Sequence, residues 1–157
     1  MLRKHFLLIF ILILPGILAE KSSAQTARKA VGAAEVNGTF RSYSTGKFKD
    51  SFDEIKIFAR GGGKLKVQFD LVYPYITGTG EMSANMGEAE GVAEIVGDTA
   101  IFMNEEFGQC VITIKFVKPG TIRVTQRGSD AECGFGRNVS ADGTYKKISS
   151  GKPKFDQ

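Results

Sequence analysis

The stretch KLKVQFDL, residues 64–71, decides the fold of this chain. Every second residue from Leu65 to Leu71 is apolar, and the residues between them are Lys, Gln or Asp. Successive side chains of a β-strand point to opposite faces, so this alternation predicts a strand with one face in a core and one face in water. We therefore expect a β-sheet that covers a hydrophobic core.

The same period-two pattern recurs on both sides of this stretch, and turn residues separate the repeats. Three turns predict hairpins: RGGG at 60–63, VGD at 96–98 and KPG at 118–120. Glycine accepts the positive φ angles of tight turns, and proline presets φ at the start of a turn. The expected strands are 38–41, 54–58, 64–71, 88–95, 99–103, 110–117, 121–126 and 143–146.

These strands predict one all-β domain, residues 37–149. The first and last strands have similar sequences, GTFR and GTYK, which suits a sheet whose ends meet and leave no exposed edge. We predict a small antiparallel up-and-down barrel of about eight strands, of calycin or lipocalin-like size, with a β-sandwich as the alternative. Residues 25–36 are expected to be a linker, and residues 150–157 a loose C-terminal tail.

One expected strand has an unusually small inward face. In residues 88–95 the side opposite the glutamates carries Ala89, Gly91 and Ala93. Such a face either lets a large neighbour pack close or leaves a hollow. A hollow would accept a small apolar ligand, so the sequence leaves a carrier function open.

The N-terminus has the parts of a secretory signal peptide, residues 1–24. A basic start is followed by the apolar run 6–14 and by the helix-breaking pair Pro15-Gly16. The apolar run is too short to span a bilayer, which needs about 20 residues. The small residues before Gln25 favour cleavage after Ala24, with cleavage after Ala19 or an uncleaved anchor as alternatives. The mature protein is then secreted or periplasmic, with no stable membrane anchor.

The net charge argues against nucleic acid as a partner. The formal charge of the whole chain is +4. It falls to +2 on cleavage, because three basic residues and one acidic residue leave with the signal. The remaining basic cluster, residues 146–154, is small and typical of a solvated terminus.

Two cysteines, Cys110 and Cys133, are expected to form a disulfide, because disulfides persist outside the cytosol. Closing this loop should stabilise the fold by about 3 kcal/mol. The bridge would bring together Phe107-Gly108 and Phe135-Gly136. This end of the barrel is then either a structural staple or a rigid recognition knob.

A second unusual segment follows the deciding strand. Tyr73-Pro74-Tyr75 leaves this strand and enters a glycine-rich stretch that runs to Gly87. Tyrosines are large, stiff and amphipathic, and they are enriched at binding surfaces. Tyr73 and Tyr75 are therefore expected either to anchor a partner or to plug the barrel mouth.

The composition leaves little room for catalysis. The one histidine, His5, lies in the signal peptide, so the mature chain can form no histidine relay and no histidine metal site. The carboxylate pairs 53–54, 105–106 and 130–132 are close in sequence, but adjacent residues on a strand do not face one another. We expect turn capping and solvation of them, no metal, no cofactor and no enzymatic activity.

The segment from Cys133 to Tyr145 (CGFGRNVSADGTY) resembles the C-terminal signature of small, exported bacterial β-barrel proteins of no assigned activity. Within it, residues 140–145 are similar to the serine-glycine-tyrosine motif of the periplasmic C-type lysozyme inhibitors. That resemblance implies an eight-stranded barrel with a disulfide. The tyrosine spacing differs from that family, and its tryptophans are missing, so the likeness bears on architecture rather than on function.

The sequence as a whole favours an exported, non-enzymatic binding module. Its expected anchors are Tyr73, Tyr75, Phe107 and Phe135, and its expected partner is an extracytoplasmic protein or glycan. A hydrolase inhibitor or an envelope interaction protein would be concrete forms of this function. The alternative is a carrier that holds a small apolar ligand in the barrel interior.

Overall fold

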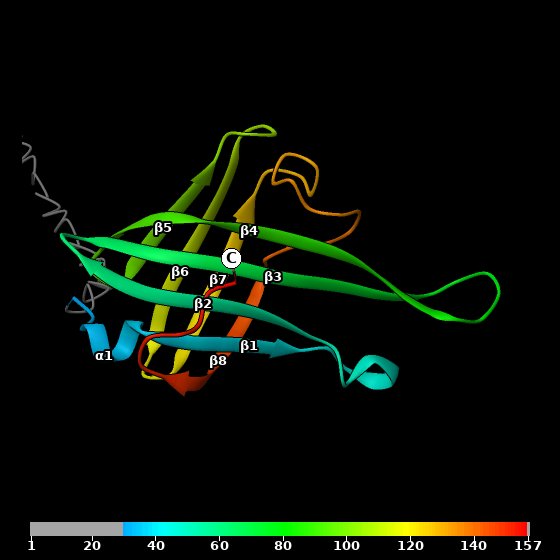
Figure 1. Ribbon diagram of the computed structural model, residues 1–157, viewed down its shortest axis with the longest axis horizontal. Helices are drawn as coiled ribbons and strands as arrows, with labels where there is room; N and C mark the ends of the chain where they lie inside the picture. The colour runs from blue at the N-terminus through cyan, green and yellow to red at the C-terminus, as the bar shows by residue number, and fades with distance from the viewer. Residues whose placement is uncertain (1–29, 157) are drawn as a thin grey trace, which may run out of the picture.

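A computed structural model describes residues 30–156. They form a closed barrel in which eight antiparallel strands follow one another in chain order (Figure 1). The predicted barrel is confirmed, and the β-sandwich alternative is wrong. The elements are α1 (Ala33–Val36), β1 (Gly38–Tyr43), η1 (Gly46–Phe48), β2 (Phe52–Gly61), β3 (Lys64–Ile76), β4 (Met82–Val96), β5 (Thr99–Asn104), β6 (Cys110–Lys118), β7 (Thr121–Arg127) and β8 (Gly143–Ser150).

All eight expected strands are present, and their alternation sorts side chains as predicted. The apolar residues of the deciding stretch, from Leu65 to Leu71, are buried in the barrel, while Lys64, Lys66 and Asp70 are not. Gln68, expected in water on the outer face, is instead 8% exposed because Asp156 covers it. The interior is filled mainly by aromatic and branched residues. Its largest fully buried side chains include Tyr145, Phe40, Phe69, Phe116, Ile55, Ile57, Ile112 and Ile114.

The first and last strands close the barrel. β1 pairs with β8 from Gly38↔Ser150 to Arg41↔Lys146, with a register shift between Thr39 and Phe40. Gly38 has a φ of 149°, and a Cβ on it would lie 2.3 Å from the Ser149 carbonyl oxygen. Only glycine fits this approach of two backbones, so the seam depends on it.

The expected linker, residues 25–36, belongs in its second half to the fold. Val36, the last residue of α1, is buried in the core, and the Val31 N–H donates a hydrogen bond to the Gly97 carbonyl. The signal peptide 1–24 and its cleavage positions lie outside the described residues. Within residues 30–156, no helix has the length and apolar character needed to cross a bilayer.

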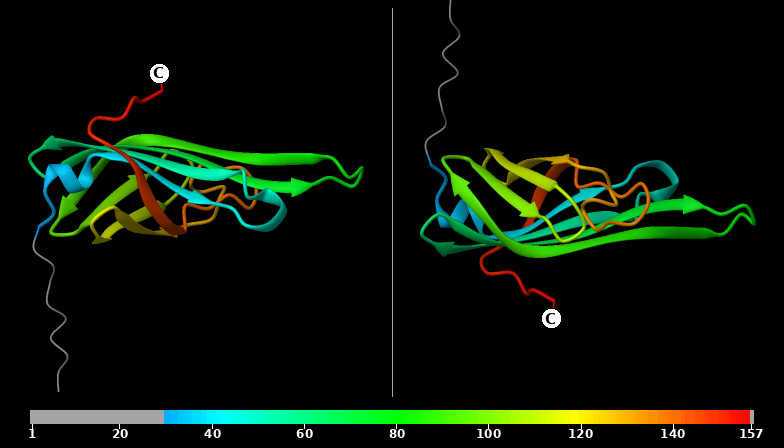
Figure 2. Two further views of the ribbon diagram at one scale, coloured as in Figure 1. Left: turned by 90° about the horizontal axis from the view of Figure 1, so that it is seen from below. Right: turned by 90° about the horizontal axis from the view of Figure 1, so that it is seen from above.

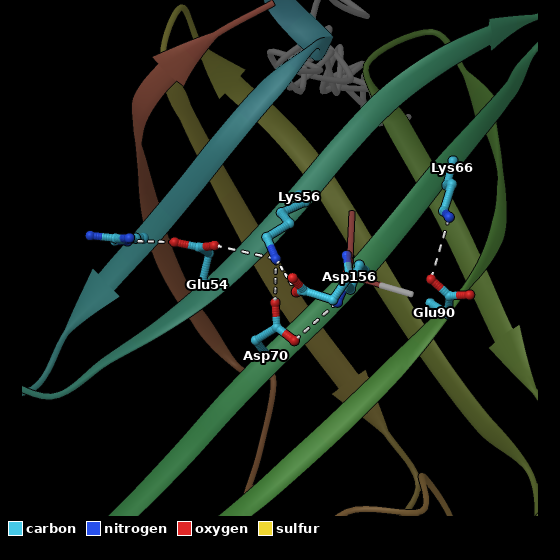
Figure 3. Close-up of polar contacts among 8 residues, drawn as sticks. Glu54, Lys56, Lys66, Asp70, Glu90 and Asp156 are labelled. Atoms are coloured by element: carbon cyan, nitrogen blue, oxygen red, sulfur yellow. Dashed lines mark hydrogen bonds and ion pairs between the residues drawn. The ribbon is translucent and has the colours of Figure 1, made fainter. Parts of the chain in front are cut away.

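Residues 150–156 are held against the barrel, in contrast to the loose tail expected for 150–157. β8 includes Ser150, and the chain then crosses the outer wall of β2 and β3 (Figure 2). Asp156 pairs with Lys56 and exchanges hydrogen bonds with Gln68 (Figure 3). Alternation marks which face of a strand is wet, but not which distant segment covers that face.

The small inward face of β4 is occupied by large neighbours. A Cβ on Gly91 would lie 3.0 Å from the Phe102 ring, and the Phe102 and Phe69 rings lie 5.2 Å apart. A Cβ on Gly87 would lie 2.7 Å from Val139 and 2.9 Å from Phe135. The small residues of β4 therefore allow aromatic side chains to pack against its backbone.

This packing predicts that Gly87→Ala destabilises the fold. The added methyl would overlap Val139 and Phe135, and overpacking of this kind costs about 1–3 kcal/mol. Urea denaturation of the purified protein measures the loss. Gly78→Ala is the matched control, because a Cβ there meets no atom within 4 Å. Equal stability of the two variants would contradict the close approach at Gly87.

Candidate functional site

The strands β3 and β4 extend well beyond the rest of the barrel (Figures 1 and 2). Their pairing continues from Lys64↔Glu94 to Ile76↔Met82, whereas β4 pairs with β5 only over Ala93–Val96. We call residues 72–86 the arm. The arm is a two-stranded ribbon that projects from one end of the barrel.

The arm corrects the expectation that residues 72–87 are mostly loop. Proline is unfavourable inside a strand, because it has no N–H to donate to a ladder. The Val72 N–H donates to Asp53 Oδ1 at the start of β2, 2.8 Å away. Pro74, two residues further on, faces the same edge beyond the end of β2, where no strand needs its missing N–H.

The two faces of the arm differ in chemistry. One face continues the inward side of the barrel, and we call it the tyrosine face. The other continues the outer wall, and we call it the apolar face. The tyrosine face carries Tyr73, Tyr75, Ser83 and Asn85. The apolar face carries Val72, Pro74, Ile76, Met82, Ala84 and Met86.

A groove of about 440 Å³ lies along the tyrosine face. Its lining residues are Tyr73, Tyr75, Asn85, Arg137 and Asn138. The first three come from the arm, and the last two come from the loop between β7 and β8. Tyr73 is 41% exposed, so it is accessible to a ligand and does not plug the barrel.

The loop of residues 128–142 is tied directly to the arm. The Asn85 side-chain amide donates to the Arg137 carbonyl at 2.7 Å, and the Gly136 N–H donates to the Met86 carbonyl at 2.9 Å. The arm and the loop therefore form the two walls of the groove as one hydrogen-bonded unit.

Asp130 fixes the backbone at the loop side of the groove. Its carboxylate accepts hydrogen bonds from the N–H groups of Asn138, at 2.6 Å, and Ala131, at 2.8 Å. These bonds, that from Asn138 first, lower the pKa of Asp130 below its ordinary value. Asn138 adopts a positive φ of 64°, a conformation that asparagine tolerates better than most residues. The loop is thus ordered before a ligand arrives.

The predicted disulfide between Cys110 and Cys133 is confirmed. It brings the two Phe-Gly segments together, and the Phe107 ring covers Gly134, where a Cβ would lie 2.5 Å from it. Phe107 is 59% exposed but does not line the groove. Phe135 is only 6% exposed and packs in the interior, which corrects its expected role as a contact residue.

The structure thus brings two of the four expected anchors, Tyr73 and Tyr75, into one groove. Sequence reasoning missed Asn85, Arg137 and Asn138. The residues Gly136-Arg137-Asn138 are a weak local signal for a turn, because glycine and asparagine both tolerate turn conformations. No local pattern indicated that this turn lies against the arm, more than fifty residues earlier in the chain.

The carboxylates of two of the three sequence pairs, 53–54 and 130–132, have structural partners. Asp53 faces the barrel and accepts the Val72 N–H, whereas Glu54 faces outward and pairs with Arg41. Glu132 accepts hydrogen bonds from the N–H and hydroxyl of Ser129, as expected of a turn-capping residue. Among residues 30–156, no group of three or more His, Cys, Asp or Glu residues is placed to hold a metal ion.

Comparison with known proteins yields no relative: no family model, curated protein or solved structure matches the chain. The resemblance to lysozyme inhibitors therefore stays a prediction. The site has to be interpreted from its own geometry.

Because Phe135 is buried, we predict that Phe135→Ala lowers the stability of the fold rather than removing a contact with a ligand. Truncating a buried phenylalanine costs about 3–5 kcal/mol. Thermal and urea denaturation measure this loss. Phe107→Ala, on an exposed ring of the same type, should cost much less. A small effect at Phe135 would mean that its ring is not part of the core.

Asp53, at the root of the arm, predicts a pH-dependent stability. Its burial raises the pKa of its carboxyl above the ordinary value. As the pH falls, the Asp53 carboxylate therefore takes up a proton at a higher pH in the folded state than in the unfolded state. Asp53 lowers the free energy of unfolding most at a pH where it is ionised in both states. Asp53→Asn keeps an acceptor for the Val72 N–H and removes the buried charge.

We therefore expect Asp53→Asn to be more stable than the native protein near pH 7, with the difference shrinking toward about pH 3. Urea denaturation at both pH values checks this. Glu105→Gln is the control, because it also removes one negative charge but from an exposed side chain. Lower stability of Asp53→Asn near pH 7 would show that the charged hydrogen bond outweighs the cost of burial.

Proposed function

We propose that this chain is an exported, non-enzymatic binding module whose ligand enters the groove between the arm and the loop of residues 128–142. The observation that carries the proposal is the convergence of Tyr73 and Tyr75 with Arg137 and Asn138 on one accessible groove. Large aromatic residues beside a guanidinium are typical of binding surfaces rather than of structural surfaces.

The chemistry of the groove favours a ligand that combines a flat apolar group with a carboxylate. Tyrosine rings stack on sugar rings and on planar or apolar side chains, and their hydroxyl groups accept and donate hydrogen bonds. The planar guanidinium of Arg137 matches a carboxylate in a two-pronged contact. An acidic glycan and an acidic protein loop both have this chemistry.

The order of the groove supports binding with little loss of entropy. The disulfide, the hydrogen bonds of Asp130 and the contact between Asn85 and Arg137 hold both walls in place. A ligand then has to order few protein groups, which favours affinity. A projecting arm of this kind also suits insertion into the cleft of a hydrolase, which would make the protein an inhibitor.

Two features support a place outside the cytoplasm. The N-terminal residues have the pattern of a secretory signal, and the disulfide between Cys110 and Cys133 is of a kind that persists in oxidising compartments. The carrier alternative has less support. The hollow that it needed beside Ala89, Gly91 and Ala93 is packed by Phe102 and its neighbours.

The proposal predicts that Tyr73→Ala weakens binding by at least about tenfold and shifts the melting temperature by less than about 2 °C. Suitable probes are oligogalacturonate and a glutamate-rich peptide, with a neutral glucose oligomer as reference, and isothermal calorimetry measures their affinity. Arg137→Gln should lose the preference for acidic probes. Tyr43→Ala, an exposed tyrosine outside the groove, is the matched control.

Each result of this experiment has a defined meaning. Binding of oligogalacturonate alone identifies a glycan, and binding of the peptide alone identifies a protein loop. If neither acidic probe binds the native protein, or if Tyr43→Ala has the same effect as Tyr73→Ala, the groove is not the binding site.

A further inference from the structure

The apolar face of the arm is a second surface that the proposed function does not use. Its residues face each other across the ribbon in three successive pairs, Val72↔Met86, Pro74↔Ala84 and Ile76↔Met82. The methionines are among its most exposed side chains, with Met82 at 65% and Met86 at 56%. None of these six outward positions carries a charge.

The apolar surface continues from the arm onto the barrel wall. Tyr43 and Phe52 pair across β1 and β2, their rings 5.6 Å apart, and both point outward. A hollow of about 410 Å³ joins the wall to the arm, and Phe52, Val72 and Met86 line its apolar side. Arg41, Glu54 and Asp70 line its other side, and the Arg41 guanidinium lies over the Phe52 ring, 3.9 Å from its centre. The surface therefore spans four strands at the root of the arm and two strands along it.

The outward side chains change from apolar to charged at a single row of residues. One row closer to the barrel, the outward side chains of the same four strands are Arg41, Glu54, Asp70 and Glu88. Beyond that row every outward position on the arm is apolar. Contiguous exposed apolar surfaces of this kind usually mark interaction sites in soluble proteins.

Negative charge borders the apolar face at both ends. At the root, Arg41 pairs with Glu54, and Lys56 contacts Glu54, Asp70 and Asp156 (Figure 3). Glu88 adds a further carboxylate in the same row, so acidic groups outnumber basic ones there. At the tip, Glu81 follows the turn of the arm.

We propose that the apolar face binds a protein segment whose apolar side chains are flanked by lysine or arginine. Such a segment would place apolar groups on Met82, Met86 and the hollow beside Phe52, and basic groups toward the carboxylates at the root and the tip. Flexible methionine side chains adapt readily to the shape of an apolar partner. Opposite charges at the rim fix the register and raise the rate of association.

The same charges select against two other occupants. Two copies that stack their arms in opposite directions would bring Glu81 of one copy toward Asp70 and Glu88 of the other. An anionic membrane would meet the carboxylates at both ends of the face. Like charges in contact oppose association in both cases.

The test uses two fluorescein-labelled peptides of equal length, one alternating lysine with leucine and one alternating glutamate with leucine. Fluorescence anisotropy should show that the lysine peptide binds the native protein at least about tenfold more tightly than the glutamate peptide does. Met82→Gln with Met86→Gln should weaken this binding by a similar factor, and Glu88→Gln should weaken it less. Met103→Gln is the matched control, because Met103 is 63% exposed on β5.

Four results would overturn the proposal. Equal affinity for the two peptides, or equal effects at Met103 and at the pair Met82 and Met86, would exclude a charge-matched site on this face. A concentration-dependent dimer in sedimentation, lost in the double variant, would identify a second copy as the occupant. Cosedimentation with phosphatidylglycerol vesicles, lost in the same variant, would identify a membrane.

The two binding surfaces can be separated by experiment. Tyr73 lies on the opposite face of the ribbon from Met86, so Tyr73→Ala should leave the affinity for the lysine peptide unchanged. The double methionine variant should in turn leave binding of acidic probes in the groove unchanged. Failure of one surface therefore does not hide the result for the other.

Discussion

The pairing of β1 with β8 is the constraint on which the rest of the structure depends. It closes the sheet, so that one alternating face of every strand has to point into a shared interior. Gly38 permits the close approach at this seam, and Lys147 on β8 donates hydrogen bonds to the carbonyls of Ala34, Glu35 and Asn37. The burial of this ammonium lowers the pKa of Lys147. The seam therefore holds both the barrel and its N-terminal turn.

A closed barrel of this size has little interior to spare, and the small residues of β4 determine how that interior is used. Gly87 and Gly91 let Phe135, Val139 and Phe102 pack against the strand backbone. The same packing draws the loop of residues 128–142 onto the root of the arm. The interior is therefore filled by side chains that stabilise the fold. The residues accessible to a ligand lie on the outside, where the loop and the arm meet.

The arm exists because β3 and β4 remain paired with each other beyond the residues at which their pairing with β2 and β5 ends. A two-stranded ribbon has no core of its own, so both of its faces are open to partners. The tyrosine face is backed by the loop and forms a groove with a guanidinium at its wall. The apolar face carries no charge and ends at carboxylates. Their different chemistry explains why one projection can offer two distinct surfaces.

The amino-acid sequence by itself determined the strands and the buried face of each, because alternation and turn residues act over a few neighbours. It determined the cysteine pairing because the chain has only two cysteines. It did not indicate that β3 continues through Pro74, since the missing N–H is tolerable only where β2 has ended. Only the tertiary structure decided that Arg137 lines the same groove as Tyr73, that Phe135 is buried and that Asp156 binds Lys56. These contacts join segments far apart in the chain, and barrel closure, rather than any local preference, brings them together.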